Sequence, residues 1–488
     1  MSETNISTTS PETTLRQRRR RNSIRSLLFL GLCLLLSPLY FWVLSGKQLQ
    51  SALAEADRLD PGWRINDLEA SRRSIPDNEN SGLVLIAAKQ LMPAHWPAWE
   101  FTSAPENKEL NHELLASLPV VLLDRDPPVR IEPGHLKILR DELRRAAPAL
   151  AEAHKILDFP RGRYPIQYAK DYISTLLVHT QDSRRFADLF AYEAALHAEE
   201  EDMEGALLAC RGIVRAEDSV GDEPTLVSML LRMGTRQLAL KKIQQVLALG
   251  QPSEPSLAAL QHLLEDEERE PLFLNGLRGD RAIMDGLMQA IQNGEVKSGQ
   301  LPSLLENSGF RAAKGTEIAL VAATIRNQRG ALLRWYTRAV EIAKLPLEEQ
   351  KTQFMELEAT TKKLPFLARA LRTDVVKVSD SWLLDQVSFR CAIALLAVER
   401  YRLAQGRWPE KLAELVPTYL GKAPVDVFEG APLRLRRFSD GVMVYSVGPD
   451  GVDNGGRFDK NPRLKGTDWG YRLWDIPRRR QPPRKAGK

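Results

Sequence analysis

The sequence has few cysteines and histidines, and it lacks the local motifs that identify common catalytic sites. Its seven histidines form no HExxH pair and no other metal-ligand spacing. It contains no Walker loop, no GxSxG elbow and no CxxC pair. These absences leave no catalytic site that can be recognised from local sequence. An exported hydrolase assembled from distant carboxylates stays open, because those groups need only meet in space.

Acidic residues occur in short runs, notably at residues 199–202 and 265–268. Charge runs of this kind are typical of solvated helix faces, and we interpret both in that way. Of the three cysteines, Cys33 lies in an apolar run, while Cys210 and Cys391 lie among apolar helical positions where a buried thiol is expected. A disulfide between the last two remains an alternative in an oxidising compartment.

Positive charge is concentrated at the two ends of the chain. The net charge is +5, but residues 1–25 carry +4 and residues 478–488 carry +6, so the stretch between them carries −5. A mildly acidic body offers no broad basic face for a phosphate backbone, which argues against a nucleic-acid partner. Residues 476–488 are basic and Pro-rich, and we expect a disordered tail there, either solvated or in contact with anionic lipid headgroups or envelope polymer.

One long apolar run stands near the N-terminus. Residues 26–44 read SLLFLGLCLLLSPLYFWVL, without charge, and six arginines precede them. A bilayer core takes about 20 helical residues, and Arg-rich flanks stay in the cytoplasm. The pattern predicts a single-pass transmembrane anchor at residues 26–45 in the inner (cytoplasmic) membrane, a cytoplasmic tail at residues 1–25 and an exported, periplasmic or otherwise extracytoplasmic body.

A cleaved secretory signal is the alternative interpretation of this run. The small residues Ala52-Leu53-Ala54 resemble a cleavage site. The apolar run is longer than an ordinary signal core, and the triplet lies well beyond its end, so a retained anchor fits better. Both interpretations export the body of the protein.

The body divides by pattern into three regions. Residues 46–134 read as helical and Pro-rich, with a helix over 48–59 that is stopped by Asp60-Pro61-Gly62. Residues 135–378 have helical periodicity almost throughout. Residues 379–475 read as a separate α+β module. The fold class that we predict is therefore mainly α, with a small α+β domain near the C-terminus.

Two details of the helical region carry further expectations. Residues 186–216 contain two adjacent amphipathic pieces and resemble one tetratricopeptide-type helical hairpin, although no second copy is clear at that period. An α-solenoid and an irregular helical bundle both remain open. The glycine pair of Gly276 and Gly279 predicts an inter-helix turn, with an anion-binding helix start as the weaker alternative.

The C-terminal module has a defined order of elements. A helix over residues 382–404 is ended by Gly406, and a short helix follows at 412–415. Two strands, at 433–438 and 442–447, are joined by a Ser-Asp-Gly turn. A Gly- and Asp-rich loop, SVGPDGVDNGGRFD at residues 446–459, comes next.

This module resembles the soluble domain of type II secretion pseudopilins, which are related to type IV pilins. The segments that carry the resemblance are ERYRLAQGRWPEKLAELVPTYL, PVDVFEGAPLRLRR and VYSVGPDGVDNGG. It implies a helix packed on a small antiparallel sheet and a loop that binds Ca²⁺, with Asp450, Asp453 and Asp459 as the side-chain ligands and the carbonyls of Ser446 and Val447 as backbone ligands. Oxygen donors on a Gly-rich loop suit this ion. A solvated turn is the competing interpretation.

One departure limits what the resemblance implies. Pseudopilins polymerise through an acid-containing hydrophobic helix that is continuous with the globular domain, whereas the apolar run here has no acidic residue and lies far upstream of the module. The sequence therefore predicts a membrane-anchored envelope protein with a scaffold or interaction role and with protein partners in the envelope. The alternatives are the exported hydrolase and an accessory component of a type II secretion or type IV pilus-like machine.

Overall fold

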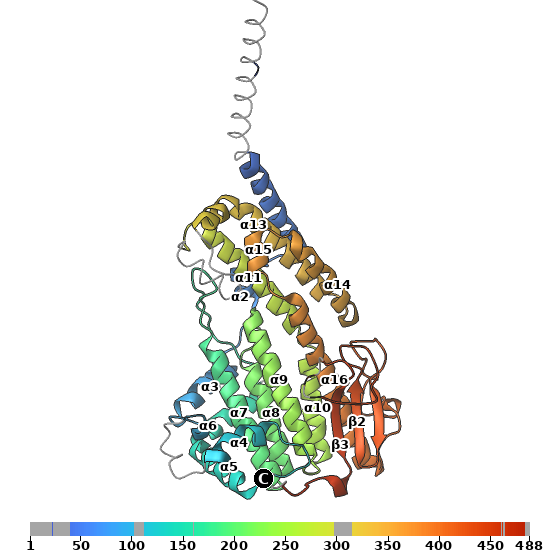
Figure 1. The fold of residues 1–488 in the computed structure, drawn as a ribbon. Coiled ribbons are helices and arrows are strands. Elements are labelled where there is room, and N and C mark those ends of the chain that lie inside the picture. Colours follow the sequence, from blue (N-terminus) through green and yellow to red (C-terminus); the bar gives the residue numbers. More distant parts are fainter. Residues whose placement is uncertain are drawn as a thin grey trace, which may run out of the picture. The chain divides into compact units, whose positions relative to one another are not determined.

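The fold is mainly helical, with one small sheet near the C-terminus (Figure 1). A computed structural model describes residue 22 and residues 40–101, 112–159, 161–296, 315–459, 461 and 464–483. Contacts divide the chain into two compact units. Unit 1 comprises residues 1–61, 288–335 and 363–372, and unit 2 comprises residues 62–287, 336–362 and 373–488.

Unit 1 contains a helix over residues 40–59 that packs against α13 (Gly315–Ala343, whose last residues belong to unit 2). Arg334 of α13 donates from Nη2 to a backbone carbonyl of that helix at 3.0 Å, and its guanidinium lies 3.6 Å from the Glu55 carboxylate. Gly330 permits the close approach, because a Cβ at this position would lie 3.2 Å from the backbone of the facing helix. The helix over residues 40–59 is thus held along α13. Unit 1 also contains α15 (Phe366–Leu371).

The expected anchor at residues 26–45 is described only from Tyr40 onward, and residues 26–39 lie outside the described residues. The helix ends at Leu59 as expected, with Gly62 in the left-handed region at φ 73°. In the part of the chain that the structure describes, one stretch is long and apolar enough to cross a membrane, Phe366–Gln405, and 89% of its most apolar window is buried. Such burial is typical of a core helix.

Unit 2 packs its helices around a common core. The helical hairpin expected at residues 186–216 is confirmed as α7 and α8: Asp202 caps α8 by accepting from Gly205 N at 2.9 Å, and Gly212 faces the Phe190 ring so closely that a Cβ would overlap it. α7 also contacts α3, α5 and α9. The helices are α2 (Ile65–Ser71), α3 (Ser81–Gln90), α4 (His112–Leu123), α5 (Pro133–Arg145), α6 (Ala147–Ala153), α7 (Val178–Glu199), α8 (Met203–Asp218), α9 (Leu226–Leu247), α10 (Glu254–Glu268), α11 (Leu272–Gln292, whose last residues belong to unit 1), α14 (Leu347–Ala359) and α16 (Val375–Gln405).

The turn expected at Gly276 and Gly279 is wrong, because α11 runs through both residues. Gly279 instead marks a close approach of chains: a Cβ there would overlap the carbonyl oxygen of Pro224. The glycine is needed for packing between a helix and a loop. Neither a helix start nor the anion site that one would offer is present at these residues.

The C-terminal module is built as expected, with one strand more. α16 is ended by Gly406 at φ 69°, and β1 (Arg434–Phe438), β2 (Gly441–Ser446) and β3 (Trp469–Trp474) form an antiparallel sheet in the order β1-β2-β3. α16 packs on β2 and β3 and also contacts α9, α10 and α14 (Figure 1). One buried helix therefore packs against both the sheet and the helical region. The module accordingly belongs to unit 2.

The disorder expected from residue 476 is wrong for residues 476–483. After a 3-10 turn, Ile476–Arg478, the Arg479 side chain is buried and its guanidinium lies 3.0 Å from the carboxylate of Glu399 on α16. Arg480 donates to the carbonyls of Ala198 and Glu199 at 2.8 and 3.0 Å. The basic residues are ordered because they satisfy buried acceptors. Residues 484–488 lie outside the described residues.

Candidate functional site

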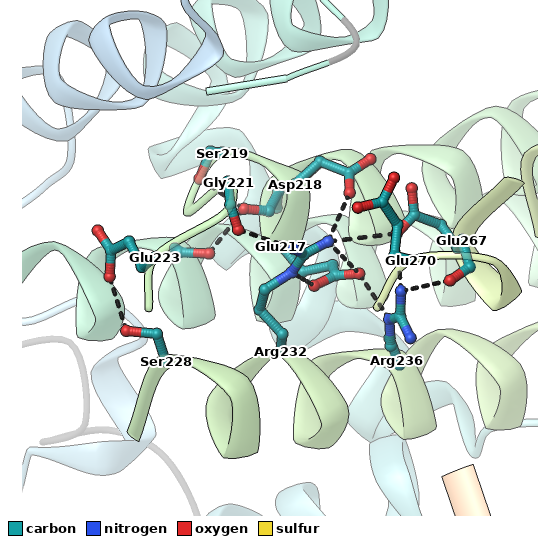
Figure 2. A network of polar contacts seen from close by, with 12 residues as sticks. Glu217, Asp218, Ser219, Gly221, Glu223, Ser228, Arg232, Arg236, Glu267 and Glu270 are labelled. Carbon is teal, nitrogen blue, oxygen red and sulfur yellow. Dashed lines mark hydrogen bonds and ion pairs between the residues drawn. The ribbon is translucent and has the colours of Figure 1, made fainter. Parts of the chain in front are cut away.

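Charged side chains from four helices meet in the interior of unit 2, and most of them are drawn in Figure 2. All are buried, with exposed fractions of 1% or less. Buried ionisable groups of this density are either a functional site or a structural cross-link, so their geometry decides the question. The members are Glu217 and Asp218 of α8, Arg232 and Arg236 of α9, Glu267 of α10 and Asp385 of α16.

Local sequence explains why the charges meet. Arg232 and Arg236 are four residues apart and so share one face of α9. Glu217 and Asp218 lie in the last turn of α8, and Glu267 lies in the last turn of α10. Carboxylates at helix C-termini face the negative end of the helix dipole, which is unfavourable unless cations are near.

The two arginines compensate this negative charge and donate hydrogen bonds to carbonyls at the C-terminal ends of α8 and α10. Arg232 Nη1 donates to the carbonyl of Gly221, just after α8, at 2.8 Å, and Arg236 Nη2 donates to the carbonyl of Glu267 at 2.7 Å. Their remaining N–H groups bind the carboxylates. Arg232 bonds both oxygens of Glu217 and lies 3.0 Å from Asp218 Oδ1, while Arg236 lies 2.9 Å from both Glu217 and Glu267.

Protonation within the network follows from burial and charge. Burial raises the pKa of Asp218 well above its ordinary value, and the neighbouring Glu267 and Glu217 raise it further. Burial likewise raises the pKa of Asp385 to about 6, although Arg236 opposes the shift. Burial disfavours the charge of Glu267 as well, but the nearby arginines outweigh it and lower that pKa. Asp218 and Asp385 are therefore the members that hold a proton most readily.

The network has the composition of a cross-link. The side-chain oxygens of Glu217, Asp218 and Glu267 lie within 4.8 Å of one another, close enough to hold a metal ion. The guanidinium groups of Arg232 and Arg236 already bind those oxygens, and Arg161 adds a third cation at 3.3 Å from Asp218. Cations supplied by the chain thus take the place that an ion would have. We interpret the network as a structural cross-link of buried ion pairs that holds four helices together.

The expected calcium loop has a different construction. Asp450 accepts from Val452 N and Gly466 N at 3.0 and 2.8 Å, and these bonds lower its pKa. Asp453 accepts from Gly455 N at 2.9 Å and forms an ion pair with Arg434 at 2.8 Å. Both carboxylates are therefore bound to groups of the chain itself.

Asp459 is the third residue that was expected to bind Ca²⁺. Its carboxylate accepts from Asn461 N at 2.9 Å. Among the described residues, the three aspartates do not form a cluster with oxygens within 4.8 Å of one another. This geometry, with Arg434 paired to Asp453, does not fit an ion held by Asp450, Asp453 and Asp459 together. Calcium binding stays a prediction.

Two buried aspartates that the sequence analysis did not single out hold the loop at its ends. Asp468 accepts from the amides of Asn454 and Gly456 at 3.1 and 2.6 Å, and also from that of Arg457. Asp426 accepts from the Ser446 hydroxyl and from Val447 N, both at 2.9 Å. These bonds fix the first residues of the loop but do not involve their carbonyls, which were the expected backbone ligands. A Gly-rich segment followed within about fifteen residues by a single Asp is the sequence signal that could have predicted that an aspartate accepts from the loop amides.

A surface pocket of about 780 Å³ lies where the end of α16 meets β1 and residues 475–477. Its aromatic wall is Trp408, whose ring centroid lies 5.2 Å from the guanidinium carbon of Arg402 and 5.6 Å from that of Arg437. Asp475 accepts from Trp408 Nε1 at 2.6 Å and lies 3.4 Å from Arg437. These groups bind one another, which favours a structural role for the Asp475 carboxylate.

Both thiols of unit 2 are free and buried, Cys210 on α8 and Cys391 on α16. Burial raises the pKa of Cys210 to about 12 and raises that of Cys391 as well. Neither is therefore a ready nucleophile at neutral pH. The structure contains no bond between them. When the chain is compared with known proteins, no protein-family model, no curated protein and no solved structure matches it.

Proposed function

We propose that this chain is a membrane-anchored envelope protein whose exported body serves as a scaffold for protein partners. The observation that carries the proposal is the exposure of Tyr40, Phe41 and Trp42, at 68%, 60% and 56%, in the first described residues of the helix over residues 40–59. Consecutive helical residues point about 100° apart, so these aromatic side chains cover more than one side of the helix. The uncharged residues 26–39 directly precede them.

Aromatic residues gather at membrane–water interfaces, where a ring is half in lipid and half in water. An apolar run with arginines before it and exposed aromatics at its C-terminal end has the order expected of an anchor that leaves the membrane at about residue 44. The helix that follows contacts α13 at Arg334 and Gly330, so this pair of helices in unit 1 would lie next to the bilayer surface.

A scaffold role rests on the construction of unit 2. The network of Arg232 and Arg236 joins four helices, and α16 joins the helical region to the sheet. Cross-links of this kind favour one fixed arrangement of surfaces for partners to bind. No nucleic-acid partner is proposed, in keeping with the acidic body.

Membrane fractionation with protease access tests the proposal. We expect the intact chain in the membrane fraction after alkaline carbonate extraction, and we expect protease added to spheroplasts to digest the body. The mass of the N-terminal peptide separates a retained anchor from a cleaved signal. Recovery of the intact chain in the soluble cytosolic fraction, or resistance of the body to added protease in spheroplasts but not in lysed cells, would refute the assignment.

A second candidate is an accessory component of a type II secretion or type IV pilus-like machine. The observation that favours it is α16 packed on a three-stranded antiparallel sheet that carries a Gly- and Asp-rich loop, the arrangement implied by the resemblance to pseudopilins. Co-purification from membranes with secretion components would support this role. A monodisperse monomer that purifies without them would count against it.

A further inference from the structure

A cationic side chain from a distant part of the sequence contacts the aromatic residues that come first in the described part of the helix over residues 40–59. Arg326 of α13 places its guanidinium carbon 4.4 Å from the ring centroid of Trp42. Its Nη1 lies 3.8 Å from where a Cβ of Gly46 would be, so the guanidinium rests over two successive turns of that helix. Both helices belong to unit 1 here, and the contact is internal to that unit.

The indole of Trp42 and the guanidinium of Arg326 both favour the membrane–water interface. An indole ring favours the boundary between acyl chains and headgroups. A guanidinium stacked on an aromatic face keeps its N–H groups in its own plane, directed sideways, where they suit a phosphate. Stacking also fixes the side chain, so less conformational entropy is lost when it binds an anion.

The position of the pair relative to the apolar run sets the expected depth. Trp42 is 56% exposed, and Val43 and Leu44 are also exposed at 43% and 37%. A soluble surface has no reason to leave five successive apolar residues, Tyr40 to Leu44, uncovered. Lipid is the cover that suits these residues, because the uncharged residues 26–39 come immediately before them in the sequence.

We propose that Trp42 and Arg326 form a binding site for the phosphate of a membrane phospholipid, with the indole at the acyl boundary and the guanidinium donating to the phosphate oxygens. The inference rests on the proposed anchor and adds a second point of membrane contact, from α13. It assigns to α13 the task of holding unit 1 at the bilayer surface. Anionic lipids should be preferred, because their net charge adds to the attraction.

Quenching of Trp42 by lipid tests the position of the ring. The full chain and its Trp42→Phe variant are placed in nanodiscs, and the difference between their emission spectra isolates Trp42 from the other tryptophans. Phospholipid brominated near the top of the acyl chains should quench this difference signal, whereas unbrominated lipid should not. A difference signal that bromination leaves unchanged, in a chain that is embedded in the nanodisc, overturns the proposal.

Lipid retention tests the role of Arg326. Native mass spectrometry of the full chain in detergent, titrated with phosphatidylglycerol, measures bound lipid. Arg326→Gln should weaken retention about fivefold, the factor that corresponds to the usual contribution of one basic residue at an anionic surface. Arg338→Gln is the matched control, because Arg338 is an exposed arginine of the same helix three turns further along, and it should change nothing.

The outcomes separate this inference from the proposed function. Equal retention by the chain and the Arg326→Gln variant, or equal loss in both variants, overturns the site while the anchor stands. Displacement of the lipid by inorganic phosphate at equal concentration would identify a site for the free ion and overturn the assignment to lipid. Failure of the chain to enter nanodiscs at all is the result that contradicts the anchor itself.

Discussion

Replacing Arg236 with methionine should destabilise unit 2 more than almost any other single substitution. Methionine has a similar length but no charge, so Glu217, Glu267 and Asp385 lose a cation that lies 2.9, 2.9 and 3.3 Å away, and the Glu267 carbonyl loses its donor. Removal of one partner from a buried ion pair leaves an uncompensated charge and costs about 3–5 kcal/mol. Urea unfolding of the solubilised chain, followed by circular dichroism, measures this loss.

A matched control lies on the same helix. Lys241 is paired with Asp124, but both side chains are about half exposed. Because surface ion pairs contribute about 0–1 kcal/mol, Lys241→Met should change the free energy of unfolding by no more than that. If Arg236→Met costs no more than this control, the reasoning about the network is refuted.

A second substitution checks that uncompensated charge is the cause. Adding Asp385→Asn to Arg236→Met removes one of the stranded carboxylates, so the double variant should recover about 1–3 kcal/mol relative to Arg236→Met alone. A double variant that is less stable than the single one would indicate lost packing, since Arg236 also covers the Phe389 ring at 4.8 Å.

The pH dependence of Asp385 follows from the same burial. Its pKa is about 6 in the folded chain, raised from an ordinary 3.8, so between these values the folded state binds a proton that the unfolded state does not. The contribution of Asp385 to the free energy of unfolding is therefore fully present below about pH 4 and is lost as the pH rises through 6. The free energy of unfolding of the unsubstituted chain should fall relative to that of Asp385→Asn between pH 4 and 7, and the opposite slope would contradict the assignment.

Three further predictions concern other parts of unit 2. Gly279→Ala should destabilise by about 1–3 kcal/mol because its Cβ would overlap a backbone carbonyl, whereas Gly234→Ala, with open space around the position, should stabilise α9 by about 0.5–1 kcal/mol; thermal melts compare the two. Arg479→Met should cost about 3–5 kcal/mol by leaving Glu399 buried with one cation fewer, and equal stability in urea would contradict this. If the loop at residues 446–459 binds Ca²⁺, chelator should lower the melting temperature; an unchanged melt counts against the ion.

Elements set by local periodicity could be predicted from the sequence. The end of the predicted helix at Gly406 and the two strands joined by a Ser-Asp-Gly turn appear near their predicted bounds, because side-chain pattern and turn chemistry act over a few residues. The helix itself begins at Val375, seven residues before the predicted start at 382. β3 was not predicted. Its pairing partner, β2, lies more than twenty residues before it, and that pairing has no local signal.

Acidic runs were the main failure at the candidate site. Residues 265–268 and 199–202 were interpreted as solvated faces, yet Glu267 is fully buried in the network and Glu199 is 97% buried and bonded to Ile131 N at 2.8 Å. Composition of a run cannot say which of its members points inward. Spacing can: Glu267 lies three residues after the buried Leu264 and so continues the apolar face of α10.

The pairing of Gln481 with the segment between α4 and α5 has a consequence for how the chain folds during synthesis. Gln481 N donates to the carbonyl of Pro128 at 2.6 Å, and Arg130 N donates back to Gln481 O at 2.9 Å, a pairing of segments separated by some three hundred and fifty positions. A nascent chain cannot form these two hydrogen bonds until residue 481 has been synthesised. Unit 2 therefore completes its native structure only after residues 479–481 have been made, and products that stop short of residue 479 should be more susceptible to proteases.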